Sequence, residues 1–159
     1  FFPEMHYHNS FKIQEPPSLS APSDSVPLTG RELEYSMEAA RKLEIPIDIA
    51  KSSVAVSNGQ SLFVTNCAVC HGVNAKGADG DGPMWAHLLN TGYRAASPGD
   101  LTDTGPTVPK ADGEVFLIIT KGFADAYGLP SDRFVMPPFG KILTEDERWM
   151  LVRYIRSLQ

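Results

Sequence analysis

The stretch CAVCH, residues 67–71, contains the only two cysteines in this chain of 159 residues. Cys67 and Cys70 are three positions apart, and His71 follows the second cysteine directly. On a helical turn, residues at i and i+3 lie on nearly the same side, so both thiols can face one partner molecule. The stretch therefore predicts a site in which two sulfurs and one imidazole act together.

The spacing C-x-x-C-H is typical of covalent haem attachment. In that chemistry each thiol of Cys67 and Cys70 adds to one vinyl group of the porphyrin, and His71 becomes an axial ligand of the iron. A large apolar group would also complete the core of a small domain rich in glycine and loops, as metals and disulfides do in other small scaffolds. We therefore expect one covalent haem c (heme c), and a chain that does not fold properly without it.

Three other uses of paired cysteines fit less well. A thioredoxin-type redox pair would need a βαβ setting, which the sequence lacks. A disulfide across two intervening residues would close a very small loop and contribute little stability. Zinc would need two further ligands at close spacing, and the remaining histidines show no recognisable pairing. These histidines are His6, His8 and His87.

Composition and charge limit the classes of function. Apolar residues make up 42% and charged residues 21% of the chain, as in ordinary globular domains. The formal net charge of −5 at pH 7 argues against a nucleic-acid-binding role and is explained most simply by solubility. No apolar run approaches the ~18 residues of a membrane span. Because the chain begins with Phe1 rather than Met, we expect a processed product, and removal of an export signal would fit.

Residues 1–51 differ in composition from the rest of the chain. Four prolines and several serines lie in FKIQEPPSLSAPSDSVPLTG, residues 11–30, without helical or strand periodicity. Because proline fixes φ and lacks a backbone donor, this piece should be extended or polyproline-like. Helix formers at 31–43 predict a helix that Pro46 stops. We expect 1–51 to be an extended, partner-wrapping segment with one short helix, and 52–159 to be the folded domain.

From residue 52 onward the sequence predicts an all-α fold of three to four helices joined by long loops. The first expected helix opens at Ser57 or Asn58 and runs into the cysteines, and the second spans 83–90. The third starts at Asp112 and ends before Gly122, and the fourth spans 144–158. The last is the most distinct, because Thr144 and Glu147 form a capping box and apolar residues follow at helical spacing. The β-branched stretch before Gly122 is equally compatible with a buried strand.

A low-spin electron carrier needs a second axial ligand on the iron. Met136 lies in FVMPPFG, residues 134–140, where two prolines stiffen the backbone beside it. The competitors are His87 and Met84, both in the predicted helix 83–90. Histidine–methionine ligation raises the haem potential relative to two histidines and leaves no open position on the iron. We therefore expect outer-sphere electron transfer with Met136 as second ligand, and no substrate that is bound and turned over.

These motifs resemble those of class I, monohaem c-type cytochromes. The resemblance covers about residues 52–159 and rests on NGQSLFVTNCAVCHG, GDGP, MPPFG and LTEDERWMLVRYIRSL. It implies a cytochrome c-like fold in which the first and last helices cross at close range. Gly59, Phe63 and Tyr154 are the matching positions at that crossing. Glycine permits close backbone approach there, and an aromatic pair adds about 0.5–1.5 kcal/mol beyond area burial.

The same resemblance has two further implications. The carbonyl of Pro83 is expected to accept a hydrogen bond from the ring of His71, which orients the imidazole and strengthens it as a ligand. Haem attachment in this family takes place outside the cytoplasmic membrane, so we expect the protein on the periplasmic side of that membrane. Basic neighbours for the haem propionates would be Arg94, Lys110 and Arg133, although solvated surface charge is the simpler explanation for each.

The N-terminal segment is similar to that of the monohaem cytochrome c subunit of alternative complex III, a bacterial quinol-oxidising complex. The similarity lies in FKIQEPP and DSVPLTGRELEY. It implies that the proline-rich segment runs over neighbouring subunits of a membrane respiratory complex. Subunits of that family are often lipoproteins, so a lipid anchor in this protein would precede Phe1.

Three functions are compatible with these features. The first is a monohaem electron-transfer subunit of a membrane-bound quinol-oxidising complex, passing electrons to a soluble carrier or a terminal oxidase. The second is a free periplasmic electron shuttle. The third is a haem enzyme domain such as a peroxidase, which needs an exchangeable sixth ligand. We favour an electron-transfer protein that is not an enzyme by itself, with other subunits and redox proteins as partners and no nucleic acid.

Overall fold

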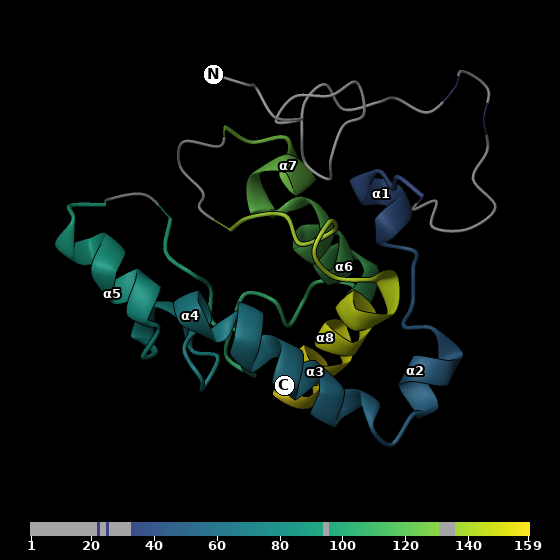
Figure 1. Cartoon of the computed structure of the whole chain (residues 1–159), viewed down its shortest axis with the longest axis horizontal. Helices are drawn as coiled ribbons and strands as arrows, with labels where there is room; N and C mark the ends of the chain where they lie inside the picture. The colour runs from purple at the N-terminus through teal and green to yellow at the C-terminus, as the bar shows by residue number, and fades with distance from the viewer. Residues whose placement is uncertain (1–21, 23–24, 26–32, 94–95, 131–135) are drawn as a thin grey trace, which may run out of the picture. The chain divides into compact units, whose positions relative to one another are not determined.

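The computed structural model describes residues 22, 25, 33–93, 96–130 and 136–159. The chain divides into two units, Phe1–Leu33 and Glu34–Gln159, and every helix of the described residues lies in the second unit. No β-strand occurs among the described residues, so the all-α fold expected from the sequence is confirmed (Figure 1). The expectation of an extended, partner-wrapping segment falls mainly on residues 1–32, of which only 22 and 25 are described.

In the second unit, the described residues form eight α-helices and one 3-10 helix. They are α1 (Met37–Ala40), α2 (Ile47–Lys51), α3 (Ala55–Asn66), α4 (Ala68–His71), η1 (Gly77–Asp79), α5 (Pro83–Asn90), α6 (Asp112–Lys121), α7 (Phe123–Tyr127) and α8 (Glu145–Ser157). The alternative of a buried strand before Gly122 is wrong, because α6 occupies that stretch and ends at this glycine. In the described part of the chain, none of these helices has the length and apolar content needed to cross a bilayer.

The most extensive contact between helices of the described residues lies between α3 and α8, where Gly59 faces the last helix (Figure 1). A Cβ atom at Gly59 would overlap the carbonyl oxygen of Met150 and lie 2.8 Å from the Cβ of Tyr154. No larger residue fits there unless one helix moves. The rings of Phe63 and Tyr154, both buried, have centroids 5.4 Å apart. The three crossing residues expected from the sequence therefore meet as predicted.

Helix α8 forms as its sequence predicts and supplies much of the core. Thr144 and Glu147 make the expected capping box, in which each side chain accepts a hydrogen bond from the other residue's backbone N–H. The rings of Phe116 in α6 and Trp149 in α8 stack with centroids 4.2 Å apart. The apolar face of α8 is buried. It comprises Trp149, Leu151, Val152, Tyr154 and Ile155.

The compact unit begins at Glu34, well before the boundary at residue 52 expected from composition. In the clasp, as we call residues 34–51, α1 packs against α6 and α2 packs against α8. Ala40 is fully buried, and a Cβ at Gly113 in α6 would overlap the Ala40 carbonyl oxygen. The clasp therefore belongs to the compact unit, because its helices bury Ala40 and Ile49.

Two local expectations differ from the structure. The helix expected at 31–43 is only α1, because the Ser36 side chain caps the helix at the Ala39 N–H, and isolated short helices gain little beyond what packing supplies. Residues 31 and 32 lie outside the described part. The stretch after Gly122, expected to be loop, begins with α7, which is too short to show a helical period and ends at the left-handed Gly128.

Candidate functional site

The CAVCH motif forms one helical turn at the junction of α3 and α4. Cys67 ends the first helix, with its N–H donating to the Phe63 carbonyl oxygen at 2.8 Å. It also starts the second, because its carbonyl oxygen accepts from the N–H groups of Cys70 at 3.1 Å and His71 at 2.9 Å. No disulfide joins the two cysteines. The turn therefore holds the two sulfurs and the imidazole in one short, hydrogen-bonded piece of backbone.

The environment of the thiols does not favour thiol redox chemistry. Burial raises the pKa of the Cys67 thiol to about 12, and the neighbouring Cys70 adds to the rise. Burial also raises the pKa of Cys70. Redox-active cysteine pairs need the opposite, a lowered pKa that supplies thiolate at neutral pH. The thioredoxin-like alternative therefore finds no support in the surroundings of the motif.

His71 is held so that one ring nitrogen is engaged and the other remains available. Its Nδ1 lies 3.0 Å from the carbonyl oxygen of Gly99. With the proton on Nδ1, this nitrogen donates to Gly99 and leaves the lone pair of Nε2 for a metal. Burial lowers the pKa of the ring, while the Gly99 bond opposes that shift. The imidazole is therefore neutral at neutral pH, which is the form that binds a metal.

The hydrogen bond expected from His71 to the Pro83 carbonyl goes to Gly99 instead. Pro83 is the first residue of α5 and is exposed. Carbonyl groups in the first turn of a helix accept from N–H groups one turn later, so the Pro83 carbonyl is committed to its own helix. The partner of His71 therefore lies in the loop at residues 97–101, which we call the strap, and not at the start of α5.

The strap is tied by its backbone to the loop that follows His71. The Ala78 N–H donates to the Pro98 carbonyl oxygen at 3.0 Å, and the Leu101 N–H donates to the Ala75 carbonyl oxygen at 2.9 Å. Gly77 has a φ of +61°, and a Cβ there would overlap the backbone of the strap. Backbone bonds on both sides of Gly99 therefore fix the place of its carbonyl.

Met136 lies on a loop that is attached to the end of α6. The N–H groups of Phe139 and Gly140 donate to the carbonyl oxygens of Ile119 at 2.9 Å and Thr120 at 3.1 Å. Gly122 has a φ of +80°, and a Cβ there would lie 2.7 Å from the Met136 carbonyl oxygen. The half-buried Met136 side chain packs against both apolar clusters of the domain, the larger of which Cys67 also contacts.

The two competing ligands lie on the helix that contacts α4. His87 and Met84 are both exposed on α5, which contacts α4. Their exposure gives no sign that either is held toward the motif. Within the described residues, no group of three or more histidine, cysteine, aspartate or glutamate side chains is arranged to hold a metal ion, which a zinc site would need.

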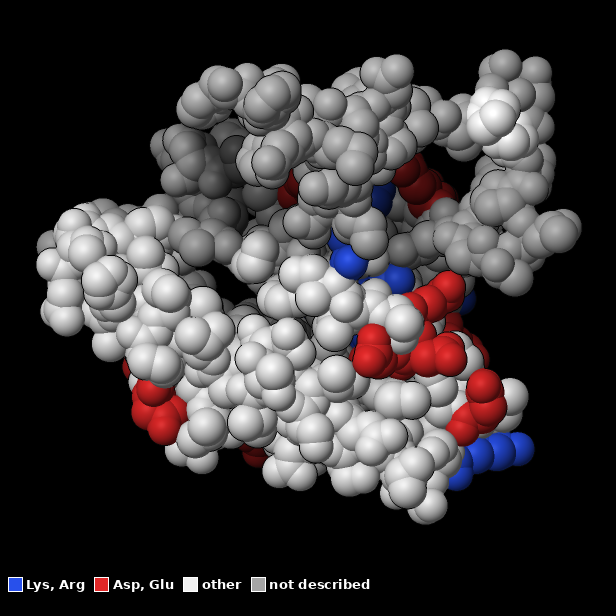
Figure 2. Space-filling view, viewed as in Figure 1, with Lys and Arg blue, Asp and Glu red and all other residues white. Residues whose placement is uncertain are grey.

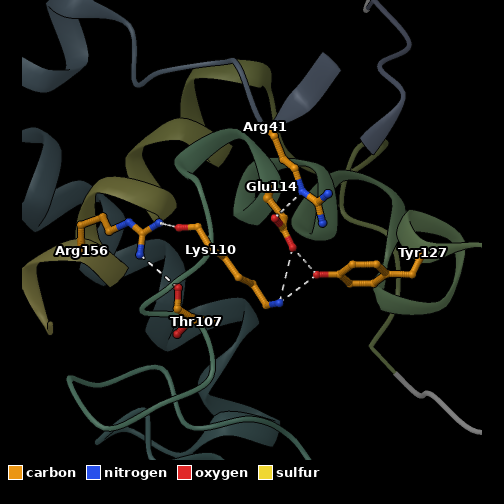
Figure 3. Close-up of polar contacts among 6 residues, drawn as sticks. All are labelled: Arg41, Thr107, Lys110, Glu114, Tyr127 and Arg156. Atoms are coloured by element: carbon orange, nitrogen blue, oxygen red, sulfur yellow. Dashed lines mark hydrogen bonds and ion pairs between the residues drawn. The ribbon is translucent and has the colours of Figure 1, made fainter. Parts of the chain in front are cut away.

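Lys110 is part of a polar cluster rather than a solvated surface charge. Glu114, only 6% exposed, accepts from Arg41 Nε at 2.9 Å and from the Tyr127 hydroxyl at 2.5 Å (Figure 3). Lys110 Nζ donates to the Tyr127 hydroxyl at 2.9 Å and lies 3.4 Å from Glu114. We call these four residues the Glu114 cluster. Arg94 and Arg133 lie outside the described residues.

The contacts that hold the site in place join residues that are far apart in the chain, and they were not predicted from the sequence. Glu114 and Arg41 are 73 positions apart, and nothing local in the sequence joins them. The Gly99 carbonyl is a backbone group, so no residue type marks it. The signal available was the Pro-Gly-Asp turn at 98–100, which indicates a tight loop but not its partner.

A family model for cytochrome c matches residues 56–159. The chain belongs to the cytochrome c family. This cytochrome is 32% identical, over 110 residues, to the cbb3-type cytochrome c oxidase subunit FixP of Sinorhizobium medicae (strain WSM419). The aligned part is 65% of this chain but only 30% of that relative's length. Family membership establishes an electron-transfer protein that carries covalent haem c, as expected from the cysteine spacing.

The residues around the motif suit haem c. Two thiols in one turn and an imidazole with Nε2 available are the donor set that haem c requires. The neighbouring helices α4 and α5 expose the apolar side chains of Val69, Met84 and Leu89, which suit contact with an apolar macrocycle. On the face seen in Figure 2, uncharged side chains cover most of the described surface and acidic ones stand in separate groups.

Proposed function

We propose that this cytochrome carries one haem c through thioether bonds to Cys67 and Cys70, with His71 and Met136 as axial ligands, and that it passes single electrons in a membrane respiratory chain. The observation that carries the proposal is the bond between His71 Nδ1 and the Gly99 carbonyl oxygen at 3.0 Å. It leaves Nε2 as the coordinating atom beside two free thiols. Ligating histidines typically donate their other ring N–H in this way.

When bound, the haem supplies an iron that alternates between the ferric and ferrous states. The chain's contribution is to keep the ligands in place in both states. His71 is fixed within a helical turn and by the strap, and Met136 is fixed through backbone bonds to the end of α6. With His71 and Met136 both bound, the iron would offer no coordination site to oxygen or peroxide. This arrangement favours electron transfer over the peroxidase alternative.

The proposed partners are subunits of a membrane-bound respiratory complex on the periplasmic side of the cytoplasmic membrane. FixP, the relative that shares 32% identity, is a subunit of a cbb3-type oxidase. The N-terminal segment resembles that of the cytochrome subunit of alternative complex III, which is a quinol-oxidising complex. We propose the quinol-oxidising complex as the assembly that holds this cytochrome, with a soluble carrier or terminal oxidase as electron acceptor.

Spectra of the purified protein test the haem site. We expect a Soret band, a sharp α-band after reduction, and the weak near-infrared sulfur-to-iron band in the oxidised protein. Absence of the Soret band would contradict haem attachment altogether. A Soret band without the sulfur-to-iron band, together with ready binding of carbon monoxide by the reduced protein, would remove Met136 as a ligand and favour an enzyme.

Fractionation of the native cells tests the partner assignment. Membranes should be washed with high salt and then solubilised in mild detergent, and the cytochrome followed by its haem absorbance through size-exclusion chromatography. We expect it to elute with quinol-oxidising activity in a large complex. Recovery wholly as a soluble monomer would establish the free shuttle instead, and co-elution with oxidase activity alone would place it in an oxidase.

A further inference from the structure

We propose that Asp100 is a positioning residue for the axial imidazole. Its carboxylate fixes the turn that directs the Gly99 carbonyl at His71, and so sets how strongly the imidazole donates to the iron. This inference rests on the proposed function, in which His71 ligates the haem iron. It assigns a role in tuning the haem to a side chain that is not itself a ligand.

The carboxylate of Asp100 accepts three hydrogen bonds from the residues that follow it. Oδ1 accepts from the backbone N–H of Thr102 at 2.8 Å and from the Thr102 hydroxyl at 2.7 Å. Oδ2 accepts from the Thr104 hydroxyl at 2.9 Å. These bonds close an Asx-type turn, in which an aspartate side chain replaces a backbone acceptor. They also lower the pKa of the carboxyl below its usual value, the Thr102 backbone bond most of all.

The turn closed by Asp100 leaves little freedom for the peptide group before it. The Gly99 carbonyl carbon is bonded directly to the nitrogen of Asp100, so the Asp100 backbone fixes one side of that peptide plane. On the other side the Pro98 carbonyl is held by Ala78. A Cβ at Gly105 would overlap the Asp100 carbonyl oxygen, so the returning chain packs directly against the turn.

The strap is also tied to the end of α8. Gln159 Nε2 donates to the carbonyl oxygen of Leu101 at 3.1 Å and to the Thr107 hydroxyl at 2.9 Å. These bonds, together with the backbone bonds to Ala75 and Ala78, keep the strap near His71 without the Asp100 carboxylate. The specific contribution of the Asp100 carboxylate is the orientation of one carbonyl group within it.

That orientation has an electronic consequence. A good hydrogen bond from Nδ1 to a carbonyl makes the imidazole a stronger donor, which stabilises ferric iron more than ferrous iron. If the carbonyl turns away, the hydrogen bond weakens and ferrous iron is favoured. Loss of the Asp100 carboxylate should therefore raise the midpoint potential and let the Nδ1 proton exchange faster with water.

Three variants of the holoprotein separate this effect from simple loss of charge. Asp100→Ala removes both the charge and the acceptor. Asp100→Asn removes the charge but keeps a side-chain oxygen that can accept from the Thr102 N–H. Asp103→Ala removes a nearby exposed carboxylate that closes no turn with its neighbours. The readouts are the midpoint potential and, by NMR on the reduced protein, the exchange rate of the His71 Nδ1 proton.

We expect Asp100→Ala to raise the potential more than Asp103→Ala does, and to speed Nδ1 exchange about tenfold. Asp100→Asn should shift the potential no more than Asp103→Ala, with exchange near the wild-type rate. Equal potentials and equal exchange rates in Asp100→Ala and Asp103→Ala would overturn the proposal, because the carboxylate would then act only as a charge. A rise in Asp100→Asn equal to that in Asp100→Ala would also overturn it.

Two further observations keep the test decisive. If Asp100→Ala gives no holoprotein, Asp100→Glu keeps the charge but moves the carboxylate one methylene farther out, so that it no longer closes the Asx-type turn with Thr102, and exchange at the wild-type rate in that variant would overturn the proposal. The wild-type spectrum separates this inference from the proposed function. If the ring protons of His71 lack the large upfield shifts of a haem ligand, the proposed function itself fails, whereas ligand-like shifts with unaltered exchange refute only the role of Asp100.

Discussion

The two axial ligands of the proposed haem site are held in different ways. The His71 side consists of α4 and the strap, and its bonds join the loop after the motif to residues some 20 to 30 positions later. The Met136 side consists of the loop at 136–140 and the end of α6, with the clasp packed behind that helix. The histidine is therefore fixed within a helical turn, whereas the methionine lies in a loop that backbone bonds tie to the end of another helix. The Met136 side should be the easier of the two to disturb.

The largest effect is expected on the His71 side, where the cofactor is attached. Cys67→Ser removes one thioether, and we expect the yield of stable holoprotein to fall by at least tenfold because haem completes the core. Haem staining and absorbance measure the yield, with Val64→Ser, at an exposed position on α3, as the control. A normal yield of fully stable Cys67→Ser protein would show that the domain folds without this bond.

Met136→Ala should leave the haem attached and change its properties. We expect the midpoint potential to fall by a sizeable part of the range of about 0.8 V over which axial ligands set haem potentials. We also expect the reduced protein to bind carbon monoxide. Redox titration and difference spectra measure both. Val64→Ala, at an exposed position on α3, is the control. Unchanged potential and spectra in Met136→Ala would shift the ligand to His87 or Met84.

Two glycines with the same backbone conformation allow the two sides to be compared directly. Gly72 has φ of 75° and ψ of 159°, and Gly122 has φ of 80° and ψ of 162°. Alanine at either position should destabilise the domain by about 1–3 kcal/mol, because only glycine adopts this region easily. Only at Gly122 does the new Cβ meet the Met136 carbonyl oxygen, at 2.7 Å.

We therefore expect Gly122→Ala to weaken the sulfur-to-iron band and Gly72→Ala to leave it intact. Denaturant unfolding and near-infrared absorption measure stability and ligation separately. If both variants weakened the band equally, general loss of stability would explain the result, and the difference between the two sides would disappear.

An effect on stability alone, and not on the haem ligands, is expected from the Glu114 cluster, which ties the clasp to α6. Burial alone would raise the pKa of Glu114, but the bonds from Arg41 and Tyr127 and the charge of Lys110 bring it below its usual 4.5. Because the folded-state pKa is the lower one, this carboxylate contributes its full stability above about pH 4.5 and loses it as the pH falls through the folded-state pKa.

Glu114→Gln should accordingly destabilise the domain by about 1–3 kcal/mol at pH 7, with a smaller difference from wild type at pH 3.5. Urea unfolding at the two pH values measures this, and Glu38→Gln on the exposed side of α1 is the control. A difference that does not shrink at low pH would contradict the assigned pKa shift. The Nδ1 exchange rate of His71 should stay unchanged in Glu114→Gln.

The local features of this domain could be predicted from its sequence, and the long-range ones could not. The capping box at Thr144 and the proline and glycines that bound α5 and α6 are local signals, so those helices begin and end close to where they are expected. The five-residue helix α7 has no room for a period. Sequence patterns report on residues that are close together in the chain, so they do not reveal contacts between distant segments.

The partner of His71 illustrates this limit within the candidate site itself. Cys67, Cys70 and His71 are adjacent in the chain, so their spacing predicts their chemistry. The acceptor of the Nδ1 proton is a backbone carbonyl 28 positions away, and its place depends on the fold of the strap. Pro83 was expected from a family resemblance, but its carbonyl lies in a helical turn. The ligand role of Met136 stays a prediction that the spectra described above will test.

The close approach of Gly59 to Met150 bears on how such a chain matures. The two positions are roughly 90 residues apart, and bringing them together restricts a long loop whose entropy cost grows only slowly with its length. Both cysteines lie inside that loop. When the chain appears with its N-terminus first, the turn that carries both cysteines is exposed before α8 can pack against α3. We expect the enzymes that join porphyrin to the thiols to act during this interval, and the terminal helices to seal the finished domain afterwards.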